Sequence, residues 1–255
     1  MRFVDLETAR SASGLRLVVL ADVPSPWSQA AKAIIELKGI DAVAVRMPLN
    51  DAAVRSWTGV RNAPVALYED EPPRSGWAEI LALAERLQPE PALIPHEPRE
   101  RALMHGLSHE LMGEGGVLWC SRLLTIDNSI ASDGKHGYPV PVARYLGARY
   151  GYAPGCGARA RACLVQALSG LDEQLQIGRA AGPYYFGERR SALDIYSAMA
   201  VNTLALLPPQ ACPMHPVLRD ALEWLQAELA DALPSSLIEH RDMMYSRHLA
   251  LPIAI

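Results

Sequence analysis

The first third of the chain combines short apolar runs with apolar residues at helical spacing. Three apolar runs predict buried strands, over residues 15–21, 42–45 and 65–68. Between the first two runs, apolar residues recur three or four positions apart, which predicts a helix over 28–38 that ends at Gly39. A further helix is predicted over 77–87, with a short fourth strand near Arg74. A strand, a helix and a strand in succession form a parallel pair with a right-handed crossover.

Proline divides the chain in two. Residues 88–98 carry prolines at positions 89, 91, 95 and 98, a density that prevents a helix and favours a stiff connector. After this segment, apolar residues follow helical spacing almost throughout, without strand-like alternation. We therefore predict an N-terminal extension over 1–14, an α/β domain over 15–87, a linker over 88–98, an all-helical domain over 99–233 and a C-terminal tail over 234–255.

Two parts of the helical half are unusual. Residues 99–124 are predicted as one long helical segment, yet four glycines fall within residues 106–116. Each glycine costs about 1 kcal/mol in a helix relative to alanine, so the cluster indicates a close approach of a backbone or ligand, or a break. The tail carries His240, Arg241 and Asp242, which make it too polar for a core helix. It either folds back over a cleft between the domains or is loosely attached.

The composition is that of a packed globular protein and excludes several classes. The formal net charge is −4 and no cluster of five or more Lys or Arg is present, so a nucleic-acid partner is not expected. The longest apolar run, residues 15–21, is too short to span a membrane, and the first 14 residues lack a signal-peptide core. The four cysteines match neither zinc-site nor disulfide-framework spacing. We expect free thiols, no metal, no membrane partner and a cytoplasmic protein.

The segment Ser25-Pro26-Trp27-Ser28 follows the first predicted strand and opens the first predicted helix. Serine is favoured at the N-cap and proline at the position after it. A helix N-terminus has free backbone donors and partial positive charge, so it favours an anion, and a hydroxyl there can donate to a thiolate. Together these groups lower the pKa of a bound thiol from about 8.5. The alternative is that Ser25 only caps the helix.

Two more motifs have defined local chemistry. In Asn62-Ala63-Pro64-Val65, a proline stands at the start of a predicted strand, which indicates a special turn with a cis bond or a trans edge proline. Further on, Ser191 precedes Asp194 by three residues, just after the aromatic run at 184–186. This spacing predicts a capping box that starts a helix, a structural role.

The three motifs, in this order around a proline-rich linker, resemble the cytosolic glutathione S-transferase family over about residues 15–233. Ser25 and Ser28 stand where thioredoxin-like proteins carry the two cysteines of Cys-Pro-x-Cys. The turn at Pro64 is similar to the family's cis-proline turn, and residues 184–194 are similar to its capping box and hydrophobic staple. The resemblance implies an α/β thioredoxin-like domain followed by an all-α helical-bundle domain, with glutathione as co-substrate and a homodimer as the assembly.

The resemblance also implies roles for individual residues. Ser25 would activate the glutathione thiol, with Ser28 as the second candidate. Ala63, before the proline, would pair its backbone with the cysteinyl part of glutathione. The family places an acidic residue or Gln, then Ser, at the start of its third helix. The corresponding stretch here is Arg74-Ser75-Gly76-Trp77. Ser75 is therefore the nearest candidate to bind the γ-glutamyl carboxylate of glutathione, and Arg74 would assist it. The glutathione-binding set is Ser25, Trp27, Ala63, Pro64, Arg74 and Ser75.

A second set of residues is expected to line the pocket for the electrophile, across the cleft on the first helix of the helical domain. These residues are His109, Glu110, Glu114, Trp119 and Arg122. The alternative is a kinked helix with solvated carboxylates and a surface histidine. His109-Glu110 lacks the second histidine of a zinc-protease motif, so no metal is expected.

The sequence therefore predicts an enzyme that activates the thiol of glutathione for attack on a small hydrophobic electrophile. One alternative is a non-catalytic protein of the same fold that binds a ligand or a protein partner, which the atypical third-helix motif favours. A weaker alternative is a thiol isomerase, lyase or dehalogenase that uses glutathione as a cofactor.

Overall fold

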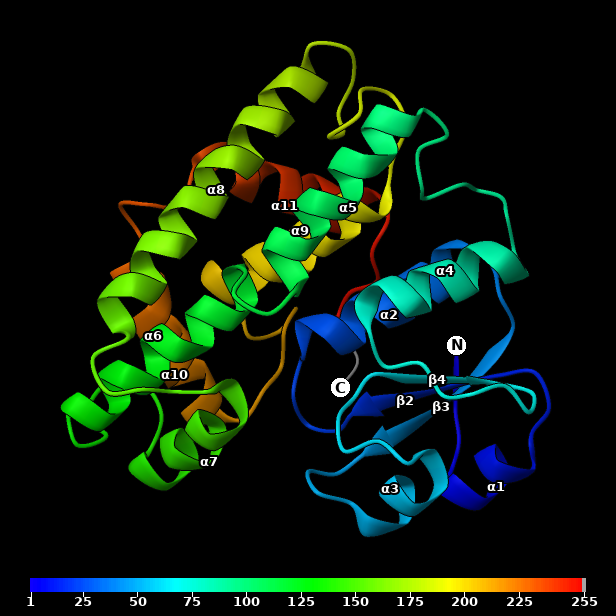
Figure 1. Ribbon diagram of the computed structural model, residues 1–255, viewed down its shortest axis with the longest axis horizontal. Helices are drawn as coiled ribbons and strands as arrows, with labels where there is room; N and C mark the ends of the chain where they lie inside the picture. Colours follow the sequence, from blue (N-terminus) through cyan, green and yellow to red (C-terminus); the bar gives the residue numbers. More distant parts are fainter. Residues whose placement is uncertain (254–255) are drawn as a thin grey trace.

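The protein consists of an N-terminal α/β domain and a C-terminal helical domain that pack side by side (Figure 1). The structure is a computed structural model and describes residues 1–253. The first domain contains β1 (Arg2–Phe3), α1 (Leu6–Ser11), β2 (Leu15–Leu20), α2 (Pro26–Leu37), β3 (Ala42–Met47), α3 (Ala52–Thr58), β4 (Val65–Tyr68) and α4 (Trp77–Leu87). The second contains α5 (Pro98–Met112), α6 (Val117–Ala131), α7 (Val140–Tyr150), α8 (Gly157–Arg179), α9 (Ala192–Leu204), α10 (Pro216–Glu228) and α11 (Ser235–Arg247).

The sheet has the strand order β1-β3-β2-β4. β1, β3 and β2 run parallel and β4 is antiparallel to β2, which confirms the predicted parallel pair. Side chains alternate across the sheet: Leu17 packs with α2 and α4 on one face, whereas Val18 packs with Val54 of α3 on the other. The fourth strand expected near Arg74 is a single bridge between Arg74 and Ala66.

Residues 1–14 belong to this sheet, so their description as an extension outside the domain is wrong. Arg2 and Phe3 of β1 pair with Val43 and Ala44 of β3, and α1 buries Ala9 against the same strand. Asp5 caps α1 by accepting the Thr8 N–H at 2.8 Å. A two-residue strand has no detectable periodicity, and the short helix α3 escaped prediction for the same reason.

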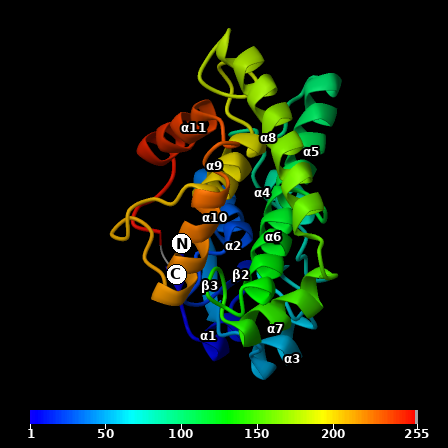
Figure 2. The same cartoon turned by 90° about the vertical axis from the view of Figure 1, so that its left-hand side faces the viewer.

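The helical domain is built around α9, whose 13 residues are all buried. Figure 2 shows α9 inside the molecule, with α8, α5, α10 and α11 around it. α9 also packs against α2 of the first domain, so one helix is shared by both halves of the core. The predicted long segment over 99–124 is divided into α5 and α6, which is the break that the glycines indicated.

The segment 235–247 is the buried helix α11, so the expectation that it is too polar for a core helix is wrong. Leu237, Met244 and Tyr245 lie in the main core, and the polar residues between them have partners. His240 Nε2 donates to Asp194 at 3.0 Å, and the Arg241 guanidinium donates to Asp242 at 2.7 Å and to the Ala205 carbonyl. These contacts offset much of the cost of burying the groups, and His240 Nδ1 is left buried without a hydrogen-bond partner.

Lys38 fixes the proline-rich linker to the first domain. Its Nζ donates to the Glu85 carboxylate at 2.7 Å and to the carbonyls of Pro91 at 2.8 Å and Pro89 at 3.3 Å. The Lys38 side chain is 0% exposed. The linker is therefore held against α2 and α4 rather than free. Within the described part of the chain, no helix has the length and apolar character needed to cross a membrane.

Candidate active site

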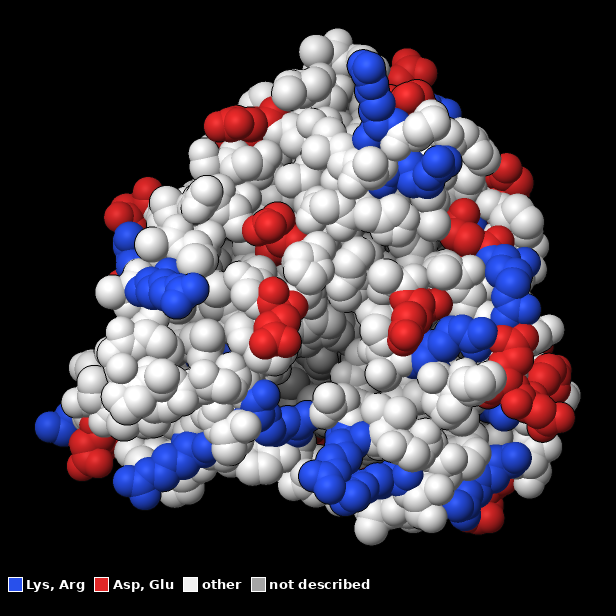
Figure 3. All heavy atoms as spheres, viewed as in Figure 1, with Lys and Arg blue, Asp and Glu red and all other residues white. Residues whose placement is uncertain are grey.

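A hollow opens between the two domains. Figure 3 shows it near the centre of the view, with acidic side chains above it and basic side chains below it. The first turn of α2 lies beside this hollow (Figure 1). The Ser25-Pro26-Trp27-Ser28 segment thus reaches the domain interface, as a site built from both domains requires.

Ser25 is the N-cap of α2, and Pro26 is the first helical residue, as predicted. Ser25 is 7% exposed, and its side chain makes no capping hydrogen bond. Because Pro26 has no N–H, the first-turn donors that remain are the backbone N–H groups of Trp27 and Ser28. The geometry therefore places a hydroxyl that is not used as a cap next to backbone donors at the positive end of a helix. This arrangement disfavours the interpretation that Ser25 only caps the helix.

Ser28 cannot share this role. Its side chain is 0% exposed, and its Oγ accepts the Leu20 N–H at 3.3 Å. The Ser28 hydroxyl therefore ties the end of β2 to α2 and faces the interior. The prediction of Ser28 as a second catalytic candidate is wrong, because a helical residue three positions after the N-cap points toward the sheet here.

Trp27 joins the two domains. Its indole Nε1–H donates to the Met112 carbonyl at 2.8 Å. Met112 is the last residue of α5, and its carbonyl is available because the helix breaks there. A Cβ on Gly116 would lie 2.4 Å from the Glu110 carbonyl oxygen, so the break requires glycine at this position. The Trp27 ring remains on the wall of the site, but its polar atom is engaged.

The turn before β4 has the predicted special geometry, since the Ala63–Pro64 peptide bond is cis. Pro64 is buried and Ala63 is half-buried. Pro64 lines one small pocket together with Trp27 and Ser75. The structure thus brings together three of the residues predicted to bind glutathione, from α2, the proline turn and the segment before α4.

Two residues that sequence analysis missed complete this pocket, Trp77 of α4 and Tyr196 of α9. The two rings meet edge to face, with centroids 5.5 Å apart, and Tyr196 Oη donates to the Trp77 carbonyl at 3.3 Å. Burial raises the pKa of Tyr196, so its hydroxyl stays protonated. Tyr196 lies in the all-buried α9, and nothing in the local sequence distinguishes it from a core residue.

Arg74 is paired with Glu71, a carboxylate that it shares with Arg86. Its guanidinium donates to Glu71 at 2.5 Å, and Arg86 donates to the same carboxylate at 2.6 Å. Hydrogen bonds from Arg86 and then from Arg74 hold the pKa of the Glu71 carboxyl below its usual range. Ser75 is exposed at the pocket edge and is therefore the more accessible of the two predicted residues.

The five residues predicted for the electrophile pocket separate into two groups. His109, Glu110 and Glu114 are exposed at the end of α5 and in the break after it. Trp119 packs edge to face on Tyr150 of α7, with ring centroids 4.7 Å apart. Arg122 donates to the hydroxyl of Tyr138. The last two residues therefore anchor α6 to the α7 region, and the structure does not gather all five around one cavity.

The helix α7 supplies contacts to the first domain that sequence analysis missed. Tyr145 Oη donates to Asn50 Oδ1 at 2.9 Å, and Arg149 donates to Asn62, the residue before Ala63. These contacts hold α7 beside the proline turn. No local motif marks them, because they join segments almost a hundred residues apart.

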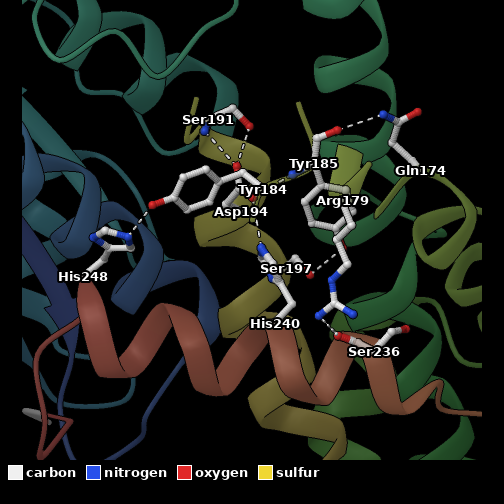
Figure 4. Close-up of polar contacts among 10 residues, drawn as sticks. All are labelled: Gln174, Arg179, Tyr184, Tyr185, Ser191, Asp194, Ser197, Ser236, His240 and His248. Carbon is white, nitrogen blue, oxygen red and sulfur yellow. Dashed lines mark hydrogen bonds and ion pairs between the residues drawn. The ribbon is translucent and has the colours of Figure 1, made fainter. Parts of the chain in front are cut away.

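The capping box forms as predicted and extends into a buried network (Figure 4). Asp194 accepts the Ser191 N–H at 2.8 Å and the Ser191 hydroxyl at 2.9 Å. It also accepts the Tyr185 N–H at 3.1 Å and His240 Nε2 at 3.0 Å. This single carboxylate therefore connects the loop before α9, α9 itself and α11. Among the described residues, no group of three or more His, Cys, Asp and Glu is placed to hold a metal ion.

Solved structures with the same fold are known. The chain aligns over 91% of its length with 99% of a Tau class glutathione S-transferase from mango, Mangifera indica, at 16% identity and a TM-score of 0.53. It aligns over 86% of its length with 94% of a glutathione S-transferase from Methylobacterium radiotolerans in complex with glutathione sulfonate, at 18% identity and a TM-score of 0.52.

A third similar structure is a maleylacetoacetate isomerase from Anaeromyxobacter dehalogenans, with 95% of this chain and 97% of that chain covered, 16% identity and a TM-score of 0.51. Comparisons with models of protein families and with curated proteins gave no match. The similarity therefore lies in the structure rather than in the sequence. The predicted arrangement of a thioredoxin-like domain followed by an all-helical domain is confirmed, and the protein has the glutathione transferase fold.

Proposed function

We propose that the protein binds glutathione at the domain interface and activates its thiol for attack on a small hydrophobic electrophile. The observation that carries the proposal is the Ser25 hydroxyl, which stands at the N-terminus of α2 without capping it. Similar structures include glutathione transferases and an isomerase, and one was solved with glutathione sulfonate bound. Glutathione is thus the proposed co-substrate, and we also propose a homodimer in the cytoplasm.

In this proposal the Ser25 hydroxyl donates a hydrogen bond to the glutathione thiolate. The free first-turn N–H groups of α2 and the positive end of its dipole stabilise the same charge. Each unit by which the thiol pKa falls requires about 1.4 kcal/mol of additional stabilisation of the thiolate. Charge-assisted hydrogen bonds supply stabilisation of this size, so one hydroxyl and one helix end suffice for a shift of one to two units, that is, roughly 1.4–3 kcal/mol.

The remaining parts of glutathione would lie in the hollow between the domains, against the proline turn and the segment before α4. The backbone of Ala63 would pair with the cysteinyl amide, and the Ser75 hydroxyl would donate to the γ-glutamyl carboxylate. Trp27, Pro64 and Trp77 would supply apolar walls. The electrophile would enter from the hollow between the domains.

A titration with glutathione tests the proposal, with binding followed by calorimetry and thiolate by ultraviolet absorbance across pH 5–9. We expect saturable binding and a thiol pKa below its free value. Ser25→Ala should bind glutathione nearly as well but raise the thiol pKa by about one unit. Ser28→Ala is the matched control, because its buried hydroxyl only accepts a backbone N–H: it should lower stability by about 1 kcal/mol and leave the thiol pKa unchanged.

A non-catalytic binding protein is the second candidate, and the engagement of Arg74 with Glu71 favours it. With Arg74 already bound to Glu71, Ser75 would be the more accessible side-chain partner of the γ-glutamyl carboxylate. Absence of binding at millimolar glutathione would support this second candidate and reject the enzyme. An unchanged pH profile in Ser25→Ala would instead remove Ser25 from the mechanism while leaving glutathione binding intact.

A further inference from the structure

A cavity of about 460 Å³ lies between the linker and the loop before α9. Its walls are the linker residues 90–96, Glu100 of α5 and the loop residues Tyr184, Phe186 and 188–191. None of these residues belongs to the candidate active site. Pockets for small organic ligands have volumes of about 300–1,000 Å³, so this cavity has the size of a ligand site.

The cavity combines apolar walls with one guanidinium that has no acidic partner. Pro91, Leu93, Ile94 and Phe186 form much of its surface. Arg190 also lines it, and in the described part of the chain no Asp or Glu forms an ion pair with Arg190. In addition, Arg190 Nε is buried and has no hydrogen-bond partner. Because no carboxylate of the described residues pairs with Arg190, its charge is left to attract an anion in the cavity.

The contact of Arg190 with His248 determines which atoms of His248 and Tyr184 donate and which accept hydrogen bonds. Arg190 Nη1 lies 2.7 Å from His248 Nδ1, and because arginine can only donate, His248 Nδ1 must accept. A neutral imidazole then carries its proton on Nε2, which lies 2.7 Å from the Tyr184 hydroxyl oxygen (Figure 4). Burial, followed by the charges of Arg190 and Arg247, lowers the pKa of His248, which is consistent with this neutral form.

Tyr184 therefore accepts a hydrogen bond from His248, and its own O–H proton is free to donate elsewhere. Tyr184 lines the cavity beside Arg190. Both side chains thus offer donors on the cavity wall, and an oxygen-rich anion is the group that satisfies them together. Two of the acids on the wall are already engaged, since Glu100 pairs with Arg189 at 3.4 Å and Glu90 accepts the Ala92 N–H at 3.1 Å.

We propose that this cavity is a second ligand site, which binds a small organic carboxylate with an apolar body. The carboxylate would contact Arg190 and Tyr184, and the apolar body would pack against the linker. The site is independent of the proposed thiol chemistry, since it shares no residue with the candidate active site. Glu188, the third acid on the wall, is exposed and offers a place for an ammonium group if the natural ligand is an amino acid.

Ligand-observed NMR titrations of the whole protein test this proposal with three probes of one shape: 3-phenylpropanoate, phenylalanine and the uncharged 3-phenylpropanamide. We expect the carboxylate to bind with a Kd of about 1 mM and the amide to bind at least about 10-fold more weakly. Tighter binding of phenylalanine than of 3-phenylpropanoate would identify an amino-acid ligand, whereas the reverse order would identify a simple carboxylate; either order supports the site.

Three variants assign the binding to this cavity. Arg190→Gln should weaken carboxylate binding by about 10-fold, and Tyr184→Phe, which removes only the hydroxyl, by about 3-fold. Arg159→Gln is the control: Arg159 is exposed on α8 and does not line the cavity, so the Kd should stay unchanged. The proposal is overturned if the amide binds as well as the carboxylate, if no probe binds at about 10 mM, or if Tyr184→Phe leaves the affinity unchanged. Probe binding that Arg190→Gln leaves unchanged would also overturn it, because it would place the probe outside this cavity.

Discussion

Replacing Lys38 by methionine is expected to destabilise the protein strongly, although the position is far from any proposed chemistry. Methionine has nearly the length of lysine but no donor. The substitution therefore preserves the packing of the stem and removes the contacts of Nζ with Glu85, Pro89 and Pro91. These contacts fix the linker that joins the two domains.

The size of the expected destabilisation follows from the burial of the Lys38–Glu85 ion pair. Removing one partner of a fully buried ion pair costs about 3–5 kcal/mol, because the other charge is left without compensation. The Lys38 side chain is 0% exposed but that of Glu85 is 18% exposed, and the Glu85 carboxylate keeps the Leu93 N–H at 3.0 Å. Water and this amide then compensate part of the lost interaction. We therefore expect a loss of about 3 kcal/mol, at the lower end of the range.

Urea unfolding followed by circular dichroism measures this effect. With a slope of about 2–3 kcal/mol per molar urea, the midpoint should fall by about 1 M or more. Lys135→Met is the control: Lys135 is exposed in the loop before α7, so its removal should change the free energy of unfolding by less than about 0.5 kcal/mol. A loss below about 1 kcal/mol in Lys38→Met would show that the buried network contributes little. Adding Glu85→Gln to Lys38→Met should recover part of the stability, because no uncompensated charge remains.

Three further predictions concern other contacts. Asp194→Ala leaves four donors without an acceptor and should lower the free energy of unfolding by about 4 kcal/mol in the same assay. His248 has a pKa below 6.5, so its protonation favours unfolding: the stability that it contributes is present above pH 6.5 and is lost as the pH falls through its folded pKa. His248→Gln should therefore flatten the dependence of stability on pH between 7 and 5, and an unchanged slope would contradict the assignment. Trp27→Phe removes the bond to Met112 and should destabilise the protein by about 1 kcal/mol, measured by urea unfolding.

Elements with strong periodicity could be predicted from the sequence, whereas elements stabilised by distant partners could not. The strands β2 and β4 and the helices α2 and α4 are apolar runs or amphipathic stretches bounded by turn residues, so each is determined locally. The helix α11 has the opposite character. His240 Nε2 has a hydrogen-bond acceptor in the core only because Asp194, 46 residues away, lies beside it, and no local pattern contains that information.

The same distinction applies to the candidate site. Ser25 at the mouth of α2 and a special turn at Pro64 follow from the local chemistry of capping and of proline, and both were predicted. Local chemistry left the Pro64 bond either cis or trans, and the structure has it cis. The roles expected for Arg74 and Ser28 depended on which atoms their side chains meet. Arg74 meets Glu71, and Ser28 meets the backbone of Leu20, contacts that only the folded chain determines.

The placement of tryptophan gives the protein an intrinsic optical signal. Two of the five tryptophans, Trp27 and Trp77, line the small pocket beside Ser25, whereas no tryptophan lines the cavity at Arg190. Indole emission responds to the polarity around the ring, so a molecule that enters the domain interface should shift the fluorescence spectrum. A carboxylate that enters the cavity at Arg190 should leave the spectrum unchanged. Occupancy of the two places can therefore be followed separately in the unlabelled protein, with no substitution and no attached dye.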